Sequence, residues 1–409
     1  MRIINNILSS FGLVALSATL LLTACNKDLE EFAPIATPTY PSGVRVAAAI
    51  AANVNDSLYN RIIIKSGMAA TLNDSTKTFT MFVPDNNALI LSLGGSLAAA
   101  NGAIASFSAA TCAGIVSYNT IGQKFLFSTF TTTFPNYPIG TLIVLDPTQP
   151  FVRMNTFPLR GTPYSYVNNV PVTAVDQAAS NGVIHHVGAL VAPPQAVLKT
   201  MIAAEPTLSY FRAAIARADS GSVGLNRFDS LFNYGVTNMT VLAPNDAAFQ
   251  TLVFGLAFQS YLSTRPMPYN ATDTANAIAT ANGAVAAGPA FLSTNNVTTA
   301  LVRGIIAYHI LASNASGSYI PSIRVFSVDL PAGVPTFVKT LVNGSIAVHP
   351  GVMATATFTG PVVSSLKFAS YGTFPPGGAA FSYVANTVAM DKHAVNGVYH
   401  IIDKVLLPQ

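Results

Sequence analysis

The chain closes on NGVYHIIDKVLLPQ, residues 396–409, and a near copy of that stretch, NGVIHHVGALVAPP, stands at residues 181–194. Five of the fourteen positions are identical, and most of the others exchange one apolar residue for another. In each copy Asn-Gly, a pair that favours a tight turn with positive φ, precedes a β-prone run. Each copy therefore predicts a turn that delivers a strand to a sheet.

Two further blocks of sequence recur in the same order. An apolar, strand-like run ends in proline twice, in FTMFVPDNNAL (79–89) and MTVLAPNDAAF (239–249), and polar residues able to cap a helix follow each proline. AGIVSYNTI (113–121) then matches RGIIAYHIL (303–311), with apolar residues at helical spacing. This ordered repetition predicts a tandem duplication of one domain. The length of 409 residues agrees, because single cores stop growing at roughly 250 to 300 residues.

These motifs resemble those of the fasciclin family, whose domains carry a proline-containing first motif, a central Tyr-His and a closing Asn-Gly-Val-x-His phrase. The second copy fits all three closely, whereas in the first copy Tyr118 is followed by Asn119 instead of His. The resemblance implies an α+β fold in which each domain is a β-sandwich-like wedge flanked by several helices. We place the first fasciclin-like domain at 44–194 and the second at 195–409.

The motif residues are the candidate contact sites for a partner. They are Pro84, Asp85, Asn86, Tyr118 and His185 in the first copy, and Pro244, Asn245, Asp246, Tyr308, His309, Asn396 and His400 in the second. The resemblance implies that the Tyr-His pair helps to fold the domain and offers an adhesion surface. Both roles stay open, since neighbouring helical positions point about 100° apart. The two closing-phrase histidines share a strand face with apolar residues, which predicts half-buried structural side chains.

The sequence carries no pattern typical of catalysis or metal binding. It has no G-x-S-x-G, no H-E-x-x-H, no Walker-type phosphate loop and no metal-spaced Cys/His cluster. His185 and His186 are adjacent, so on a strand they face opposite sides and cannot hold one ion together. We therefore expect no catalytic residue, metal or cofactor. Basic residues form no cluster, which argues against a nucleic-acid partner.

The first 24 residues have the layout of an export signal. Arg2 is followed by an apolar stretch and then by small residues before Cys25. Leu22-Thr23-Ala24-Cys25 resembles the lipobox of bacterial lipoproteins, which implies that Cys25 becomes the acylated first residue of the mature chain. Acyl chains anchor a protein at about 0.8 kcal/mol per buried CH₂. The mature chain is therefore expected to sit on a membrane without spanning it.

Residues 25–43 are expected to be the lipidated cysteine and a proline-rich tether. Three prolines between residues 34 and 41 favour an extended spacer. The charged residues 27–31 resemble a short signal that routes some lipoproteins to the outer cell surface, although an ordinary solvated tether fits them equally well. We expect a cell-envelope protein, anchored in the outer membrane and facing the surface.

The second copy is longer than the first. Between the proline of the first motif and the asparagine of the closing phrase it spans 152 residues, against 97 in the first copy. One insertion includes residues 263–296, and long insertions normally lie on the surface. It is either a partner or glycan contact through Tyr261, Arg265 and Tyr269, or a neutral surface elaboration.

Composition indicates how such a protein would bind. Charged residues make up 9% of the chain, against about 25% in ordinary soluble domains, so apolar and aromatic groups must carry most of any contact. The leading expectation is a lipid-anchored, non-enzymatic adhesion or interaction protein with a protein or matrix partner. The alternatives are a glycan-binding accessory of a polysaccharide-uptake system and a structural envelope scaffold. The absence of Trp weighs against the glycan alternative, which a cluster of exposed Tyr would favour.

Overall fold

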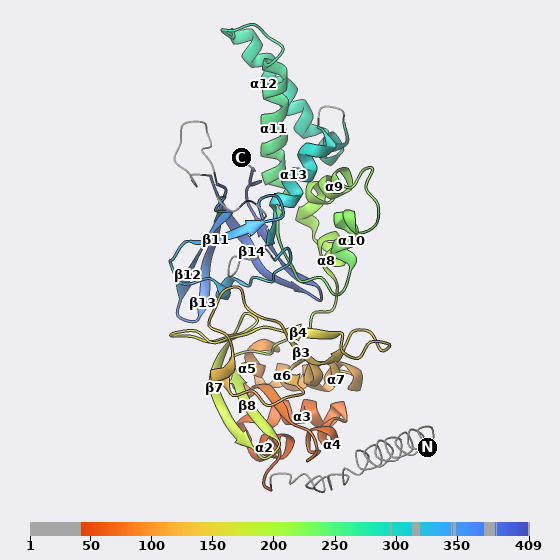
Figure 1. Ribbon diagram of the computed structural model, residues 1–409, viewed down its shortest axis with the longest axis vertical. Helices are drawn as coiled ribbons and strands as arrows, with labels where there is room; N and C mark the ends of the chain where they lie inside the picture. Colours follow the sequence, from red (N-terminus) through yellow and green to blue (C-terminus); the bar gives the residue numbers. More distant parts are fainter. Residues whose placement is uncertain are drawn as a thin grey trace, which may run out of the picture. The chain divides into compact units, whose positions relative to one another are not determined.

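The fold is described from a computed structural model of the chain (Figure 1). The structure describes residues 42–294, 297–312, 320–344, 346, 349–371, 381 and 383–407. Ser42–Gln409 forms one compact unit, in which the duplication is visible as two successive sets of helices and strands. The export signal, Cys25 and the tether as far as Pro41 lie outside the described residues.

The first copy packs six helices around its strands. The helices are α2 (Val46–Ala52), α3 (Ser57–Ser66), α4 (Ala69–Leu72), α5 (Asn86–Ser92), α6 (Leu97–Ser106) and α7 (Ala109–Tyr118). The strands are β1 (Phe79–Pro84), β2 (Thr120–Ile121), β3 (Ile139–Val144), β4 (Arg153–Thr156), β5 (Pro158–Leu159), β6 (Tyr166–Val167), β7 (Val170–Ala179) and β8 (Gly182–Val187). Helix α3 ends where Gly67 takes a left-handed φ of 73°, a conformation that glycine adopts without a Cβ clash.

The second copy repeats this order and adds a helical hairpin. Its helices are α8 (Leu198–Ala204), α9 (Ser209–Ala218), α10 (Phe228–Asn233), α11 (Asp246–Leu262), α12 (Ala271–Ala286) and α13 (Thr299–Tyr308). Its strands are β9 (Met239–Pro244), β10 (Ile310–Ala312), β11 (Thr336–Thr340), β12 (Val352–Thr359), β13 (Val362–Ala369), β14 (Val384–Ala394) and β15 (Gly397–Ile402). The stretch 263–296 of the earlier insertion begins directly after α11 and contains all of α12. These two helices lie side by side and extend away from the strands (Figure 1).

The first-motif strand and the closing strand pair in parallel in both copies. Strand β1 pairs with β8, with Phe82 opposite His185, and β9 pairs with β15, with Leu242 opposite His400. Further antiparallel strands complete a six-stranded sheet in the first copy and a closed barrel in the second. The α+β fold class is confirmed, and the predicted closing strand has a neighbouring strand on each side in both copies.

The Asn-Gly pairs work differently from the predicted tight turn with positive φ. Neither Gly182 nor Gly397 has a positive φ, because each already begins the closing strand. A Cβ at Gly182 would meet the carbonyl oxygen of Phe79, and one at Gly397 would meet the side chain of Leu198. The prediction of positive φ was therefore wrong, and these glycines are required by the close approach of neighbouring chain.

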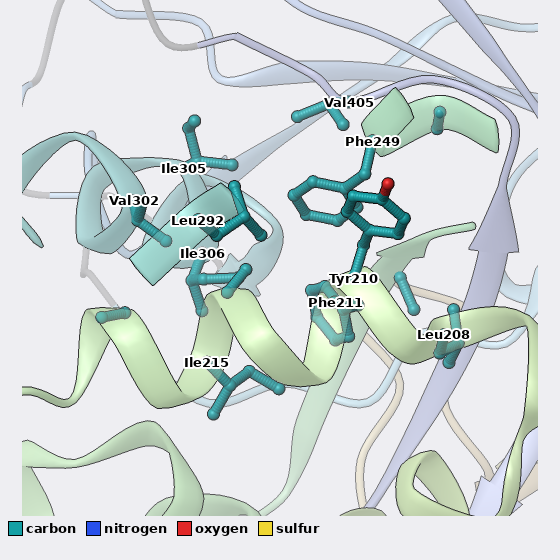
Figure 2. Close-up of a cluster of buried hydrophobic side chains, with 14 of the residues drawn as sticks. Leu208, Tyr210, Phe211, Ile215, Phe249, Leu292, Val302, Ile305, Ile306 and Val405 are labelled. Atoms are coloured by element: carbon teal, nitrogen blue, oxygen red, sulfur yellow. The ribbon is translucent and has the colours of Figure 1, made fainter. Parts of the chain in front are cut away.

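Apolar clusters lie on both sides of each parallel pair. In the second copy, aromatic and branched side chains from α9, α11 and α13 gather with Val405, which follows β15, in a core where Tyr210 stacks on Phe249 at 6.2 Å (Figure 2). Another cluster combines strands of the second copy with Phe157 and Tyr166 of the first. The two copies therefore share buried apolar surface.

Among the described residues, no single helix is long and apolar enough to cross a membrane. The consecutive helices α5 and α6 together reach the required length and composition, but they are bent by 78° at the break between them. Several of their residues, including Leu89, Ala100 and Ile104, belong to the buried core of the first copy.

Candidate functional site

The first motif joins a buried strand to a capped helix in each copy. Pro84 and Pro244 end the strands β1 and β9, whose six residues are all buried. The next side chain caps the following helix: Asp85 accepts a hydrogen bond from the amide of Ala88 at 2.8 Å, and Asn245 accepts one from Ala248 at 2.9 Å. Such caps stabilise a helix by about 1 kcal/mol.

The residue after each cap reaches back to the helix that precedes the strand. The Asn86 side chain accepts a hydrogen bond from the amide of Leu58 at 2.9 Å, near the start of α3. Asp246 accepts one from the amide of Tyr210 at 2.9 Å and another from the Ser209 hydroxyl at 2.8 Å, at the start of α9. The pairs Asp85-Asn86 and Asn245-Asp246 therefore play the same two roles. The first residue of each pair caps the following helix, and the second binds the start of the helix before the strand.

Tyr118 and Tyr308 end equivalent helices and are both buried. The Tyr118 hydroxyl donates to the carbonyl of Asn155 at 3.1 Å, and the Tyr308 hydroxyl accepts from the amide of Tyr371 at 3.3 Å. Burial raises the pKa of each phenol to about 12, so both are neutral at physiological pH.

Asn119 and His309 fasten the segment that follows the closing strand. The His309 ring donates through Nδ1 to the carbonyl of Ile305 at 2.8 Å and accepts through Nε2 from the amide of Leu406 at 3.0 Å. Asn119 instead donates to the carbonyl of Val191 at 2.8 Å, the position equivalent to Leu406. Burial lowers the pKa of His309 to about 4, so the ring is neutral in this role.

The closing-phrase histidines His185 and His400 make equivalent hydrogen bonds to the backbone. His185 Nδ1 accepts from the amide of Asp176 at 3.1 Å, and its Nε2 donates to the carbonyl of Phe125 at 3.1 Å. His400 repeats this with the amide of Asp391 and the carbonyl of Val325. Both aspartates have a left-handed φ near 60°, and burial lowers the pKa of both rings.

The expectation that these two histidines are half-buried was wrong, because both are fully buried. The rings of Phe127 and Phe130 lie 5.2 and 5.9 Å from His185, and that of Phe368 lies 5.9 Å from His400. These aromatic rings come from segments far from the closing strand in sequence, so the alternation of the strand itself could not reveal them.

The closing-phrase asparagines are buried anchors. The Asn396 side chain accepts from the amide of Leu198 at 2.8 Å and donates to the carbonyls of Phe232 and Tyr234, each at 3.0 Å. In the first copy the Asn181 side chain likewise accepts from the amide of Val46 at 2.9 Å and donates to two carbonyls. Each asparagine thus joins the first helix of its domain to the segment before the first-motif strand.

One set of residues in the second copy has the composition of a catalytic triad. The Ser327 hydroxyl donates to the Asp391 carboxylate at 2.5 Å, and Asp391 contacts His400. The His400 ring, however, receives the backbone amide of Asp391, and Ser327 is 1% exposed. A triad needs histidine next to the nucleophile and the nucleophile open to substrate. The hydrogen bonds of Asp391 therefore stabilise the local backbone, and His400 does not activate Ser327 as a nucleophile. Among the described residues, no group of three or more His, Cys, Asp or Glu could hold a metal ion.

The structure also reveals polar residues between the two copies that the sequence patterns did not single out. Arg324 is 2% exposed and lies over the ring of Phe157, 4.7 Å from its centroid. It donates to the ring of His393 at 2.8 Å, and His393 has a pKa far below the ordinary value because it is buried beside this cation. An arginine inside the apolar run SIRVFSV (322–328) was the only sequence signal for this contact.

A buried carboxyl group lies nearby. Asp329 accepts from the amide of Phe326 at 2.7 Å and lies 3.4 Å from the side-chain amide of Asn136 in the first copy. Burial raises the pKa of Asp329 to about 8, so this group is mostly protonated at neutral pH.

Cavities open to a ligand lie at several places on the described part of the chain. A groove of about 510 Å³ lies between the copies and includes Phe134, Tyr164 and Phe358. A pocket of about 230 Å³, also between the copies, has Arg153 and Arg324 in its wall. A third, of about 440 Å³, lies between α11 and α12.

Comparisons with known proteins give a family match and a similar solved structure. Residues 57–193 match the family model of the Fasciclin domain. The chain is also similar to the solved structure of a FAS1 domain pair from the insect cell adhesion molecule Fasciclin I, at 13% identity and a TM-score of 0.31, over 86% of this chain and 97% of that one. No curated protein matches the sequence. Fasciclin domains are associated with cell adhesion and interaction, and their proteins are typically non-enzymatic. Residues 57–193 therefore match a Fasciclin domain, and the sequence motifs of that stretch recur in the second copy.

Proposed function

We propose that this chain is a lipid-anchored, non-enzymatic interaction protein of the cell envelope, which binds a protein or matrix partner through its fasciclin domains. The fasciclin match over residues 57–193 carries the proposal. The N-terminal sequence supports the anchor, since Leu22-Thr23-Ala24-Cys25 is similar to a lipobox. Most motif side chains have their hydrogen bonds satisfied inside the domains, so the contact surface is sought on exposed elements.

The α11–α12 hairpin is the surface that we favour for the partner. From Ala247 to Val302 the sequence has only two charged residues, Arg265 and Asp273. Met267 at the connection between the helices is 78% exposed, and Tyr269 is 39% exposed. Exposed apolar and aromatic side chains on a projection with few charges are typical of protein contact sites.

Anchoring and surface display can be tested separately. Cys25→Ser should move the protein from the membrane fraction to the soluble fraction and abolish labelling by an alkyne fatty acid. Protease shaving of intact cells should remove the wild type, and Lys27→Ala/Asp28→Ala should block that removal if residues 27–31 route the protein outward. Protection of the wild type on intact cells would place it inside the envelope and favour the scaffold alternative.

Adhesion is tested with cells that display the protein. Met267→Ser/Tyr269→Ser should reduce attachment to the matrix or partner cells that wild-type cells bind. Val223→Ser is the matched control, because Val223 is 76% exposed in the same domain but lies away from the hairpin in sequence. Equal attachment by cells with and without the protein would refute the adhesion proposal. Equal attachment by both variants would refute the hairpin as its surface.

The groove between the copies favours glycan capture as a second candidate. Tyr164, which is 40% exposed, lies there with Phe134 and Phe358, and Thr132 and Thr133 line the same groove. Aromatic faces with adjacent hydroxyl groups suit a sugar ring, which offers C–H groups on its face and hydroxyls on its edge. Tyr164→Ala should weaken binding to a saccharide array without changing the melting temperature; an array on which the wild type binds nothing would remove this candidate.

A further inference from the structure

The pocket of about 230 Å³ between the two copies differs from the other cavities in its charge. Its wall includes two arginines, Arg153 from β4 of the first copy and Arg324 from the second, together with the polar residues Asn155 and Thr237. No aspartate or glutamate lines it. In a chain with so few charged residues, two guanidinium groups around one small space are an unusual concentration of positive charge.

Arg324 has no acidic partner among the described residues. Its guanidinium donates to the ring of His393 at 2.8 Å and to the carbonyl of Val395 at 3.1 Å, and it lies over the ring of Phe157. All three partners are uncharged, and the Nε atom has no hydrogen-bond partner at all. Burial lowers the pKa of Arg324 to about 10, which still leaves it charged at neutral pH.

The nearby acidic groups are engaged elsewhere. The Asp391 carboxylate accepts from the amide and hydroxyl of Ser327, and the Asp329 carboxyl accepts from the amide of Phe326. A buried cation without an anion is costly, and proteins normally pair such a charge. Arg324 lines the pocket of about 230 Å³, so an anion in that pocket would lie next to its guanidinium.

Arg153 is the second cation at that space. It is half-buried, and its guanidinium donates to the carbonyl of Thr141 at 3.1 Å, with no carboxylate within ion-pair distance in the described chain. Guanidinium groups present several N–H donors in one plane, which matches the oxygens of phosphate, sulfate and carboxylate groups.

We propose that this pocket is a binding site for an oxyanion, a phosphate, sulfate or carboxylate group held between Arg153 and Arg324. The volume suits such a group with a small organic substituent. Phe151, which is 79% exposed, borders the pocket and offers an apolar face to that substituent. The site uses residues of both copies, so the bound anion would also bridge the two domains. It is independent of the hairpin and of the larger groove.

The test is calorimetric titration of the full chain with inorganic phosphate, sulfate and glucuronate, with chloride at matched ionic strength and neutral glucose as controls. Saturable binding of at least one oxyanion is expected, together with a rise in melting temperature that saturates at the same concentrations. Strong binding of phosphate or sulfate would indicate a free inorganic ion, whereas binding of glucuronate alone would indicate a carboxylate carried on a sugar.

Variants distinguish the site from a general salt effect. Arg153→Gln should weaken binding about tenfold, because it removes a charge-assisted contact from a half-buried side chain. Arg160→Gln is the matched control, since Arg160 is exposed in the same domain and lies outside this pocket. Arg324→Met should abolish the stabilisation by the anion. The proposal is overturned if no oxyanion binds saturably in the millimolar range, or if Arg153→Gln binds as tightly as Arg160→Gln.

Discussion

Replacing Asn396 by alanine tests whether the closing-phrase asparagine is the anchor that its contacts indicate. Its side chain is fully buried and links three parts of the second domain. It accepts from the amide of Leu198 in α8, donates to the carbonyls of Phe232 and Tyr234 at the end of α10, and itself precedes β15. Asn396→Ala would remove all of these hydrogen bonds and leave their partners in place.

The expected magnitude follows from which partners water can reach. The bonds to Leu198 and Phe232 are buried, whereas the one to Tyr234 is only partly so. Each buried group left without a partner costs about 1 to 3 kcal/mol, so two of them lower the free energy of unfolding by about 3 kcal/mol. For a domain of about 200 residues this corresponds to a fall in melting temperature of roughly 6 to 12 °C.

The assay is urea unfolding of the full chain, followed by far-ultraviolet circular dichroism because the sequence contains no Trp. Asn226→Ala is the matched control: Asn226 lies in the same domain, is exposed and has no side-chain hydrogen bond, so its loss should change stability by less than about 0.5 kcal/mol. Asn181→Ala should destabilise the first domain comparably, since its bonds are equivalent.

A stability of Asn396→Ala within about 0.5 kcal/mol of the control would refute the anchoring role. A loss confined to the first domain's transition would refute it as well, because every partner of Asn396 lies in the second copy.

Three further perturbations follow from buried titratable groups. Burial raises the pKa of Asp329 to about 8, so the folded chain holds this proton more tightly than the unfolded chain does. The stability of the fold should therefore fall as pH rises from about 4 to 8, and Asp329→Asn should flatten the corresponding decline in melting temperature. Burial lowers the pKa of His309 to about 4, so the stability of the fold should be lost as pH falls from about 6.5 to 4. His309→Asn should reduce this loss without removing it, because other histidines are also buried in their neutral form. Cys112 is fully buried and burial raises its pKa, so a thiol reagent should modify it only in denaturant; rapid reaction of the native chain would contradict its placement.

Local patterns in the sequence predicted the strands and helix caps that recur in the two copies. The apolar run before Pro244 became a fully buried strand, and Asn245 became a helix cap, because strand burial and capping depend on residues only a few positions apart. The closing phrase formed a strand in both copies for the same reason. Asp246 and Asn86 differ in residue type, yet each accepts a hydrogen bond from a backbone amide near the start of the helix before the first-motif strand.

The structure assigned roles that the patterns left open. Tyr308 and His309 are both buried: Tyr308 packs in the apolar cluster that includes Leu242 and Leu311, and His309 accepts a hydrogen bond from the amide of Leu406. The glycine of the closing phrase is needed because Leu198 approaches it from another helix, and no feature of the Asn-Gly pair reveals that approach. Partner contact by the motif residues stays a prediction, which applies best to those that keep some exposed surface, such as Asp85 and Asn245.

The sequence by itself determined that one set of motifs is repeated in order, because apolar spacing, helix caps and repeated phrases depend on residues close together in the chain. The resemblance of these motifs to the fasciclin family added the expectation of an α+β fold. Only the tertiary structure decided how the copies meet. Asn136 and Asp329 lie 193 positions apart and come within 3.4 Å, and Arg324 packs over Phe157 of the other copy. Such contacts form only when the two folded copies pack against each other, and no local pattern in the sequence predicts them.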